Sequence, residues 1–148
     1  MLEHHGEISA MEYTLDWPAP LRTRAVHSGN GVALLTDAPI DNQGLGEHYS
    51  PTDLAAVSLA SCIMTIIGIR AASLGIEIAG MQCKCAKKMN AQPRRIGRIS
   101  VDLIVDLGSS TCSDQDRDWL RDEGKQCPVG LSLHPDIDQR INISFQSA

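Results

Sequence analysis

The sequence SPTDLAAVSLASCIMTIIGIR, residues 50–70, decides the fold of this 148-residue chain. Sixteen consecutive residues within it, Leu54 to Ile69, carry no formal charge. Ser50 and Pro51 predict a helix start, because serine caps a first turn well and proline fits the first helical position. A helix that is apolar on all its faces has to be buried on all of them. One small sheet covers only one side, so a partner subunit is the expected cover for the other.

The rest of the chain predicts strands before and after this helix. The helix should end near Leu74, with Gly75 as its C-cap. A second helix should begin at Ser113, where Asp116 resembles the second half of a capping box, and a short helical turn should follow Cys127. The predicted order is strand-strand-strand-helix-strand-strand-helix-short helix-strand, an α+β domain. The expected strands lie in residues 7–17, in two runs of 22–36 joined by a two-residue turn at Gly29-Asn30, in 77–89, in 94–107 and in 139–147.

Length, charge and cysteine content limit the function classes. A chain of 148 residues suits one domain, residues 1–148, with a substantial core. The net charge of −5 argues against a nucleic-acid binder, which needs a basic surface. The apolar run is short for a membrane span, and the first residues lack the apolar core of a secretory signal. We therefore expect a cytoplasmic protein without a membrane segment, whose five cysteines are thiols rather than disulfides.

Two cysteines have informative surroundings. Cys62 lies about three turns into the long helix, too far from the N-terminus for the helix dipole to activate it. Taken alone it is a buried, inert thiol, and it needs a cation brought by the fold to become reactive. Cys127 directly precedes Pro128 and suits the N-cap of a short helix, where free N–H groups favour a thiolate. A cysteine that merely fills a turn is the alternative for this position.

The other three cysteines give weaker signals. Met81, Cys83 and Cys85 share one face of a predicted strand, and three soft sulfur atoms suit Cu(I). Alternate strand residues are about 6.6 Å apart, which is awkward for a disulfide between the two cysteines. The same residues also suit a filling role in the core. Cys112 lies in a Gly-Ser-Ser-Thr loop and has no predicted role.

Both informative cysteines lie in motifs that resemble one family. SPTDLAAVSLASC is similar to the start of the central helix in OsmC/Ohr proteins, the osmotically induced and organic-hydroperoxide-resistance proteins. CPVGLSL, residues 127–133, resembles the second cysteine motif of that family. PRRIGRISVDLIVD and WPAPLRTRAV resemble strands of its OsmC-like branch. The resemblance extends from about residue 10 to the end of the chain.

The resemblance implies both a fold and an activity. The fold is an intertwined homodimer with small antiparallel sheets and long central helices buried across the dimer. The activity is that of a cofactor-free, metal-free enzyme that reduces organic hydroperoxides. Cys62 is then the peroxidatic nucleophile, Cys127 the resolving thiol that forms a disulfide with it, and an arginine from the early strands supplies positive charge. Arg22 is the first candidate and Arg24 the second. An external dithiol, of lipoyl type in the hydroperoxide-resistance branch, recycles the disulfide.

One position departs from the family pattern. In the best-characterised branches, an acidic residue ten positions before the first cysteine pairs with the arginine, and this chain has Thr52 there. Asp53 follows one residue later, where another branch carries its acid, but one residue on a helix is a rotation of about 100°. Glu47, on the preceding loop, is the second substitute.

Two other functions remain open from the sequence. A redox sensor or a binder of small apolar ligands would use the same dimeric fold and react slowly with peroxide. A Cu(I)-handling protein would use Met81, Cys83 and Cys85. Neither the preferred peroxide nor the reductant can be read from the residues.

Overall fold

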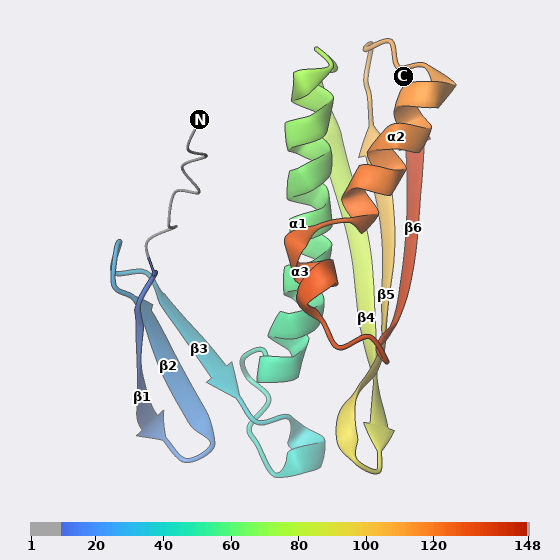
Figure 1. The fold of residues 1–148 in the computed structure, drawn as a ribbon. Helices are drawn as coiled ribbons and strands as arrows, with labels where there is room; N and C mark the ends of the chain where they lie inside the picture. Colours follow the sequence, from blue (N-terminus) through green and yellow to red (C-terminus); the bar gives the residue numbers. More distant parts are fainter. Residues whose placement is uncertain (1–9, 148) are drawn as a thin grey trace, which may run out of the picture. The chain divides into compact units, whose positions relative to one another are not determined.

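The structure, a computed structural model, describes residues 10–147 and comprises two compact units. Unit 1 runs to Pro51 and unit 2 from Thr52 onward, and each is described by itself. The element order along the chain is the predicted one, with strands and helices as in Figure 1. The single domain expected from chain length stays a prediction.

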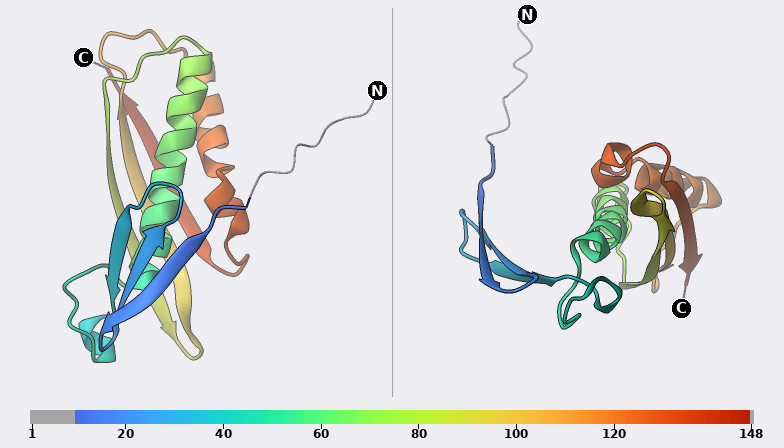
Figure 2. Two further views of the ribbon diagram at one scale, coloured as in Figure 1. Left: turned by 90° about the vertical axis from the view of Figure 1, so that its left-hand side faces the viewer. Right: turned by 90° about the horizontal axis from the view of Figure 1, so that it is seen from below.

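Unit 1 is a three-stranded antiparallel sheet in the order β1-β2-β3 (Figure 2). Its strands are β1 (Tyr13–Ala19), β2 (Arg22–His27) and β3 (Ala33–Asp37), followed by a short 3-10 turn η1 (Ile40–Asn42). The first strand begins later than expected, and part of the predicted range, residues 7–9, lies outside the described residues. The predicted two-residue turn at Gly29-Asn30 is wrong: five residues separate β2 from β3. There, the Gly31 N–H donates to the His27 carbonyl, and Gly31 adopts φ +74°.

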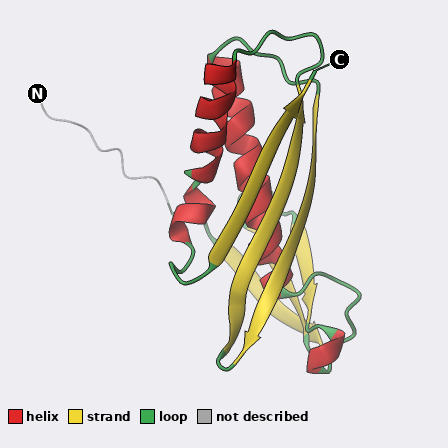
Figure 3. Ribbon diagram, turned by 90° about the vertical axis from the view of Figure 1, so that its right-hand side faces the viewer, coloured by secondary structure: helices red, strands yellow, loops and turns green. Residues whose placement is uncertain are grey.

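Unit 2 packs three helices on one face of a second sheet (Figure 1). The helices are α1 (Pro51–Ser73), which begins at the unit boundary, α2 (Asp114–Lys125) and α3 (Pro128–Ser132). The strands are β4 (Gly80–Ala91), β5 (Arg94–Asp106) and β6 (Asp138–Gln146). Figure 3 views this sheet from the face opposite the helices. The sheet is mixed rather than wholly antiparallel, because β6 pairs with β5 in parallel. The helical crossover through α2 and α3 returns the chain to the same end of the sheet, which makes a parallel pairing possible.

The core of unit 2 lies between α1 and β5. Alternate residues of β5 point toward the helices and are buried, namely Ile99, Val101, Leu103 and Val105. The buried residues of α1 recur every three or four positions along one stripe: Ala56, Leu59, Ala60, Ile63, Ile67 and Ala71. The buried residues therefore repeat every two positions in β5 and about every 3.6 positions in α1, as the sequence predicts.

The opposite side of α1 is not buried within the chain. Ile69 is 57% exposed although the whole segment is apolar. By length and composition α1 could also cross a membrane, but core helices of soluble proteins pass the same test. α1 has its buried stripe packed on β5, as a core helix does.

The capping box of α2 is confirmed. The Ser113 hydroxyl accepts a hydrogen bond from the Asp116 N–H at 3.1 Å, and the Asp116 carboxylate accepts one from the Ser113 N–H at 3.4 Å. These bonds satisfy two N–H groups that a helix start leaves without intrahelical partners. The helix ends at Lys125.

Candidate functional site

The thiols of Cys62 and Cys127 interact within unit 2, because Cys62 is one of the groups that raise the pKa of Cys127. Cys62 comes from the third turn of α1, and Cys127 directly precedes α3. Cys127 is fully buried, whereas Cys62 is half-buried. Both cysteines are free thiols in the structure. Packing of α3 against α1 therefore joins two residues that are far apart in the sequence.

Cys127 is the N-cap of α3, as predicted. Its sulfur accepts a hydrogen bond from the Gly130 N–H at 3.4 Å. The carbonyl of Gly130 in turn accepts a hydrogen bond from Gln139 at the start of β6, at 2.9 Å. The short helix is thus fixed at its first turn by its own cysteine and by a neighbouring strand.

The expectation that this N-cap position favours a thiolate is wrong, because the pKa of Cys127 is raised overall. Burial raises the pKa of the Cys127 thiol above its ordinary value. The N–H of Gly130 lowers it, the contact with Cys62 raises it, and the N–H of Val129 lowers it. Burial outweighs the backbone N–H groups, because charging a sulfur away from water is costly. Cys127 is accordingly a protonated thiol at neutral pH.

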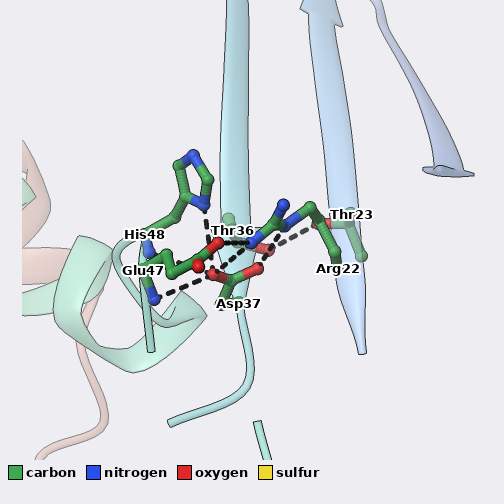
Figure 4. Close-up of polar contacts among 6 residues, drawn as sticks. All are labelled: Arg22, Thr23, Thr36, Asp37, Glu47 and His48. Carbon is green, nitrogen blue, oxygen red and sulfur yellow. Dashed lines mark hydrogen bonds and ion pairs between the residues drawn. The ribbon is translucent and has the colours of Figure 1, made fainter. Parts of the chain in front are cut away.

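Unit 1 holds the second cluster of functional groups, which centres on Arg22 (Figure 4). The guanidinium of Arg22 binds Asp37 through two bonds, from Nε to Oδ1 at 2.7 Å and from Nη2 to Oδ2 at 3.0 Å. Its Nη2 also donates to Glu47 at 2.6 Å. Two parallel bonds to one carboxylate fix the plane of a guanidinium as well as its position.

Asp37 is the anchor of this cluster. Its side chain is only 1% exposed. Besides Arg22, it accepts hydrogen bonds from the N–H groups of Glu47 and His48, both at 3.0 Å, and its Oδ2 lies 3.1 Å from His48 Nδ1. The Arg22 guanidinium holds the pKa of the Asp37 carboxyl well below its usual range, against the opposing effect of burial. Asp37 in turn raises the pKa of Arg22, so both groups stay charged at any working pH.

Arg24 has a different setting. It pairs with Asp16 on β1, and both side chains are half exposed. Side chains two residues apart on a strand share a face, so strand geometry does not distinguish Arg22 from Arg24. Their partners do, since only Arg22 is held by a buried carboxylate.

The start of α1 is held by a lysine. Lys87 on β4 donates to the hydroxyl of Thr52 at 2.6 Å and pairs with the carboxylate of Asp53, also at 2.6 Å. Thr52 is the position where the resemblance places an acid, and Asp53 is one of the two expected substitutes. Of these two substitutes, Glu47 is the one that the structure pairs with Arg22.

Asp37 and His48 are the site residues that sequence reasoning missed. A signal for Asp37 exists in strand register, because Arg22 on β2 lies directly opposite Asp37 on β3. Opposite charges at facing positions of neighbouring strands commonly pair. A two-residue turn at Gly29-Asn30 gives the same pairing, because residues 28 and 31 would then face each other and Arg22 would face Asp37, so the sequence already contained this signal.

One group of side chains among the described residues has the composition of a metal site. Ligand atoms of Asp37, Glu47 and His48 lie within 4.8 Å of one another. The Arg22 guanidinium already binds both carboxylates, so the positive charge in this cluster comes from Arg22 rather than from a metal ion.

Comparisons with known proteins agree on one family. Residues 44–142 match the family model described as OsmC-like protein. A crystal structure of a candidate osmotic stress induced and detoxification response protein from Psychrobacter arcticus is 39% identical. That match covers 93% of this chain and 98% of the other, with a TM-score of 0.82. No curated protein sequence gives a match.

Two more distant structures share the fold. One is an organic hydroperoxide resistance protein OsmC from Legionella pneumophila, at 14% identity, covering 93% of this chain and 98% of the other, with a TM-score of 0.65. The other is the organic hydroperoxide resistance protein OhrB of Bacillus subtilis, at 15% identity, covering 92% and 98%, with a TM-score of 0.59. Because the family model matches most of the length of this chain, the chain belongs to the OsmC/Ohr family of OsmC-like proteins.

Proposed function

We propose that this protein is a thiol peroxidase that reduces organic hydroperoxides through Cys62 and Cys127. The observation that carries the proposal is the contact between the two thiols, one half-buried and one fully buried. A pair of cysteines in contact is suited to a cycle in which one sulfur is oxidised and the other resolves the product. The hydroperoxide-resistance proteins of the same fold support the substrate class.

The reaction is balanced by the two thiols and one dithiol. The Cys62 thiolate attacks the terminal oxygen of the hydroperoxide, the O–O bond breaks, and the alkoxide leaves and takes a proton to become an alcohol. Cys62 is then a sulfenic acid. The Cys127 sulfur displaces its hydroxyl as water, which forms the Cys62–Cys127 disulfide. An external dithiol, of lipoyl type by family resemblance, reduces this disulfide and becomes a disulfide itself.

Arg22 is the proposed source of positive charge for the Cys62 thiolate and the peroxide. A guanidinium lowers the pKa of a nearby thiol and donates hydrogen bonds to oxygen. The support for Arg22 over Arg24 is its fixed geometry on Asp37 and Glu47. Glu47 takes the role of the missing acid in this proposal. Asp53 has its own cation in Lys87 and is assigned no catalytic part.

A homodimer is the proposed state of the protein. The side chains of Tyr13, Leu15 and Trp17 alternate along β1 and are 57%, 66% and 60% exposed, and Ile69 on α1 is similarly exposed. Exposed apolar surface on both units is what an intertwined second copy would bury. Sedimentation should give about twice the 16.0 kDa chain mass, in a cytoplasmic protein that needs no metal or cofactor. A monomer at micromolar concentration would contradict this part of the proposal.

Thiol mapping tests the catalytic pair. Reduced protein is treated with one equivalent of cumene hydroperoxide, and its free thiols are located by mass spectrometry. We expect the loss of two thiols and a peptide pair joined through Cys62 and Cys127. A Cys112→Ser variant is the matched control, because that thiol is also buried but has no assigned part. Survival of all five thiols would reject the peroxidase.

A redox sensor is the second candidate, and the raised pKa of Cys127 favours it. A protonated resolving thiol forms the disulfide slowly, which suits a sensor better than a fast enzyme. Dihydrolipoamide-dependent turnover separates the two: an enzyme consumes many equivalents of peroxide per chain, and a sensor consumes one.

A further inference from the structure

Cys83 and Cys85 lie on the helix-facing side of β4. Cys83 pairs with Leu103 and Cys85 with Val101 on β5, and both of these β5 residues are buried under the helices. Directly paired residues of neighbouring strands point to the same side of a sheet. The two cysteines therefore point toward α1, although Cys83 is only half-buried and Cys85 is exposed.

An open groove of about 450 Å³ lies between β4 and α1, and both cysteines line it. Met64 on α1 lines the same groove, so three sulfur-bearing side chains from two elements line one groove. The remaining lining residues carry no formal charge: Val57, Ala60, Ser61 and Thr65. The groove thus offers soft ligand atoms in apolar surroundings.

The strand spacing suits a bridging ion better than a direct bond. Alternate residues on a strand are about 6.6 Å apart at Cα, near the upper limit for a disulfide. A metal ion between two thiolates holds their sulfurs about 4.6 Å apart, if each metal–sulfur bond is about 2.3 Å as for zinc. Two cysteines at this spacing can reach such an ion from both sides with little change in the backbone.

We propose that Cys83 and Cys85, with Met64, form a binding site for a soft monovalent metal ion, Cu(I). Each cysteine thiol releases its proton and binds the ion as a thiolate, and the Met64 thioether completes the set without losing a proton. Thiolate and thioether ligands select Cu(I) over harder divalent ions. The oxidation state of the ion does not change, so binding requires no electron donor or acceptor.

The ligand set also argues against zinc. Structural zinc takes four ligands, usually cysteine and histidine. Among the described residues, three or more possible zinc ligands come together only at Asp37, Glu47 and His48. These residues belong to unit 1, whereas Cys83 and Cys85 belong to unit 2. Two thiolates and a thioether match the low coordination number of Cu(I).

The third sulfur differs from the one that the sequence indicated. Met81 shares the strand face of the cysteines, but it lines a separate hollow with Gly80 and Gln82. Met64, which sequence analysis could not connect to β4, takes its place in the groove.

Cys83 is a weak nucleophile in this groove. Burial raises the pKa of the Cys83 thiol, and the charges of Cys85 and Asp102 raise it further. A soft metal displaces such protons readily, whereas a peroxide requires the free thiolate. The residues that line the groove include neither Cys62 nor Cys127, so the two sites use different sulfur atoms.

Competition with a coloured Cu(I) chelator tests the site. Reduced protein is titrated without oxygen into the Cu(I) complex of bicinchoninic acid, and loss of colour reports transfer of the ion. We expect one equivalent to bind per chain. Cys83→Ser and Cys85→Ser should each weaken affinity by at least about tenfold, since even outer partners of a metal site contribute that much. Met64→Leu should weaken it less, and X-ray absorption should show only sulfur around the ion.

Matched variants decide whether the assignment is correct. Met81→Leu should bind like the unmodified protein, because Met81 is outside the groove. A Cys62→Ser, Cys127→Ser double variant should also retain binding, whatever its effect on peroxide reduction. The proposal is overturned if the unmodified protein removes no Cu(I) from the chelator. It is also overturned if the double variant loses the ion while Cys83→Ser keeps it.

Discussion

The Arg22 cluster in unit 1 and the thiol pair in unit 2 are built in opposite ways. Arg22, Asp37 and Glu47 form a site of full charges, each held by hydrogen bonds to a named partner. Cys62 and Cys127 form a site without a full charge, positioned by apolar packing of α1 and α3. The influences on the pKa of Cys127 are burial, two backbone N–H groups and the other thiol, none of them a cation. In the proposed function, the sulfur chemistry comes from residues of unit 2 and the positive charge from a residue of unit 1.

The largest expected effect comes from removing that cation. Arg22→Ala should lower kcat/KM for cumene hydroperoxide by about 10²–10³-fold, the usual loss when one group that stabilises developing charge is removed. Arg22→Lys should recover only part of the activity, because an ammonium cannot bind Asp37 through two parallel bonds. Peroxide consumption coupled to dihydrolipoamide oxidation measures both.

Arg24→Ala is the matched control for Arg22→Ala, since Arg24 pairs with the half-exposed Asp16. It should retain most of the activity. If Arg24→Ala and Arg22→Ala lose activity equally, the buried carboxylate does not distinguish the two arginines, and the comparison between them fails.

Removing the anchor of the cluster should have the next largest effect. Asp37→Asn keeps the shape of the side chain but leaves Arg22 without its buried counter-ion. Activity should fall about 10- to 100-fold, as it does for other residues that orient a functional group through hydrogen bonds without touching the substrate. Asp37 acts as a positioning residue, so Arg22→Ala and the Arg22→Ala, Asp37→Asn double variant should have the same activity. Additive losses in this cycle would contradict a positioning role. Asp16→Asn is the matched control.

The thiol pair can be disturbed without changing a charge. A Cβ added at Gly130 would lie 3.1 Å from the Gln139 side-chain oxygen and 3.3 Å from the Cys127 sulfur, so these neighbours must shift by a few tenths of an ångström. Gly130→Ala should slow disulfide formation by about threefold to tenfold, since reaction between two held groups depends on their alignment. Quenched-flow thiol mapping measures this step.

Gly68→Ala is the matched control for Gly130→Ala, because nothing lies within 4 Å of a Cβ added at Gly68. It should leave the disulfide step unchanged. Sulfenic acid formation at Cys62 should be the same in both variants. A slower first step in Gly130→Ala would show that the substitution disturbs more than the resolving thiol.

Acidification should affect the charged site at a predictable pH. The pKa of Asp37 is lowered in the folded protein, so the unfolded chain takes up a proton below about pH 4 while the folded chain does not. The contribution of Asp37 to stability is complete above that pH and is lost as the pH falls toward its folded pKa. Urea unfolding between pH 2 and 6 should give a shallower pH dependence for Asp37→Asn than for the unmodified protein. Equal slopes would contradict the assigned pKa direction.

The smallest expected effect is at the start of α1. Lys87→Met removes the cation beside Asp53, whose side chain is 40% exposed. Exposed ion pairs contribute about 0–1 kcal/mol, so the free energy of unfolding should change by no more than that. Peroxidase activity should be unchanged within about twofold, because Asp53 has no catalytic part in the proposal. A large loss of activity would show that Asp53 has a catalytic role and would contradict this assignment.

Local sequence signals predicted the elements that depend on local physics. Ser113 and Asp116 form the capping box that their spacing indicates, and α1 covers its expected residues. Cys127 caps α3 for the same reason, since proline at the next position starts a helix. These features require only neighbouring residues, and neighbouring residues are what one sequence shows.

The features that sequence reasoning missed depend on tertiary structure. The pKa of Cys127 is raised by burial under α1, which outweighs the helix start that the local sequence shows. Strand register indicates Asp37, but the hydrogen bonds that the N–H groups of Glu47 and His48 donate to it depend on tertiary structure. The parallel pairing of β6 depends on how the α2–α3 crossover returns to the sheet. Met64 and Cys83 line the same groove between α1 and β4, which no spacing along the chain indicates.

The contact between the two reduced thiols has a consequence for the rate of the whole cycle. Cys62 and Cys127 are 65 positions apart, and closing a loop of that length is entropically unfavourable in a flexible chain. Folding has already closed it before any peroxide arrives, so the second step resembles an intramolecular reaction. Well-aligned groups of this kind react as though their partner were present at about 10⁵ M or more. In the proposed cycle, Cys127 therefore reacts with the Cys62 sulfenic acid ahead of free small-molecule thiols, and this proximity offsets part of the slowing that its raised pKa causes.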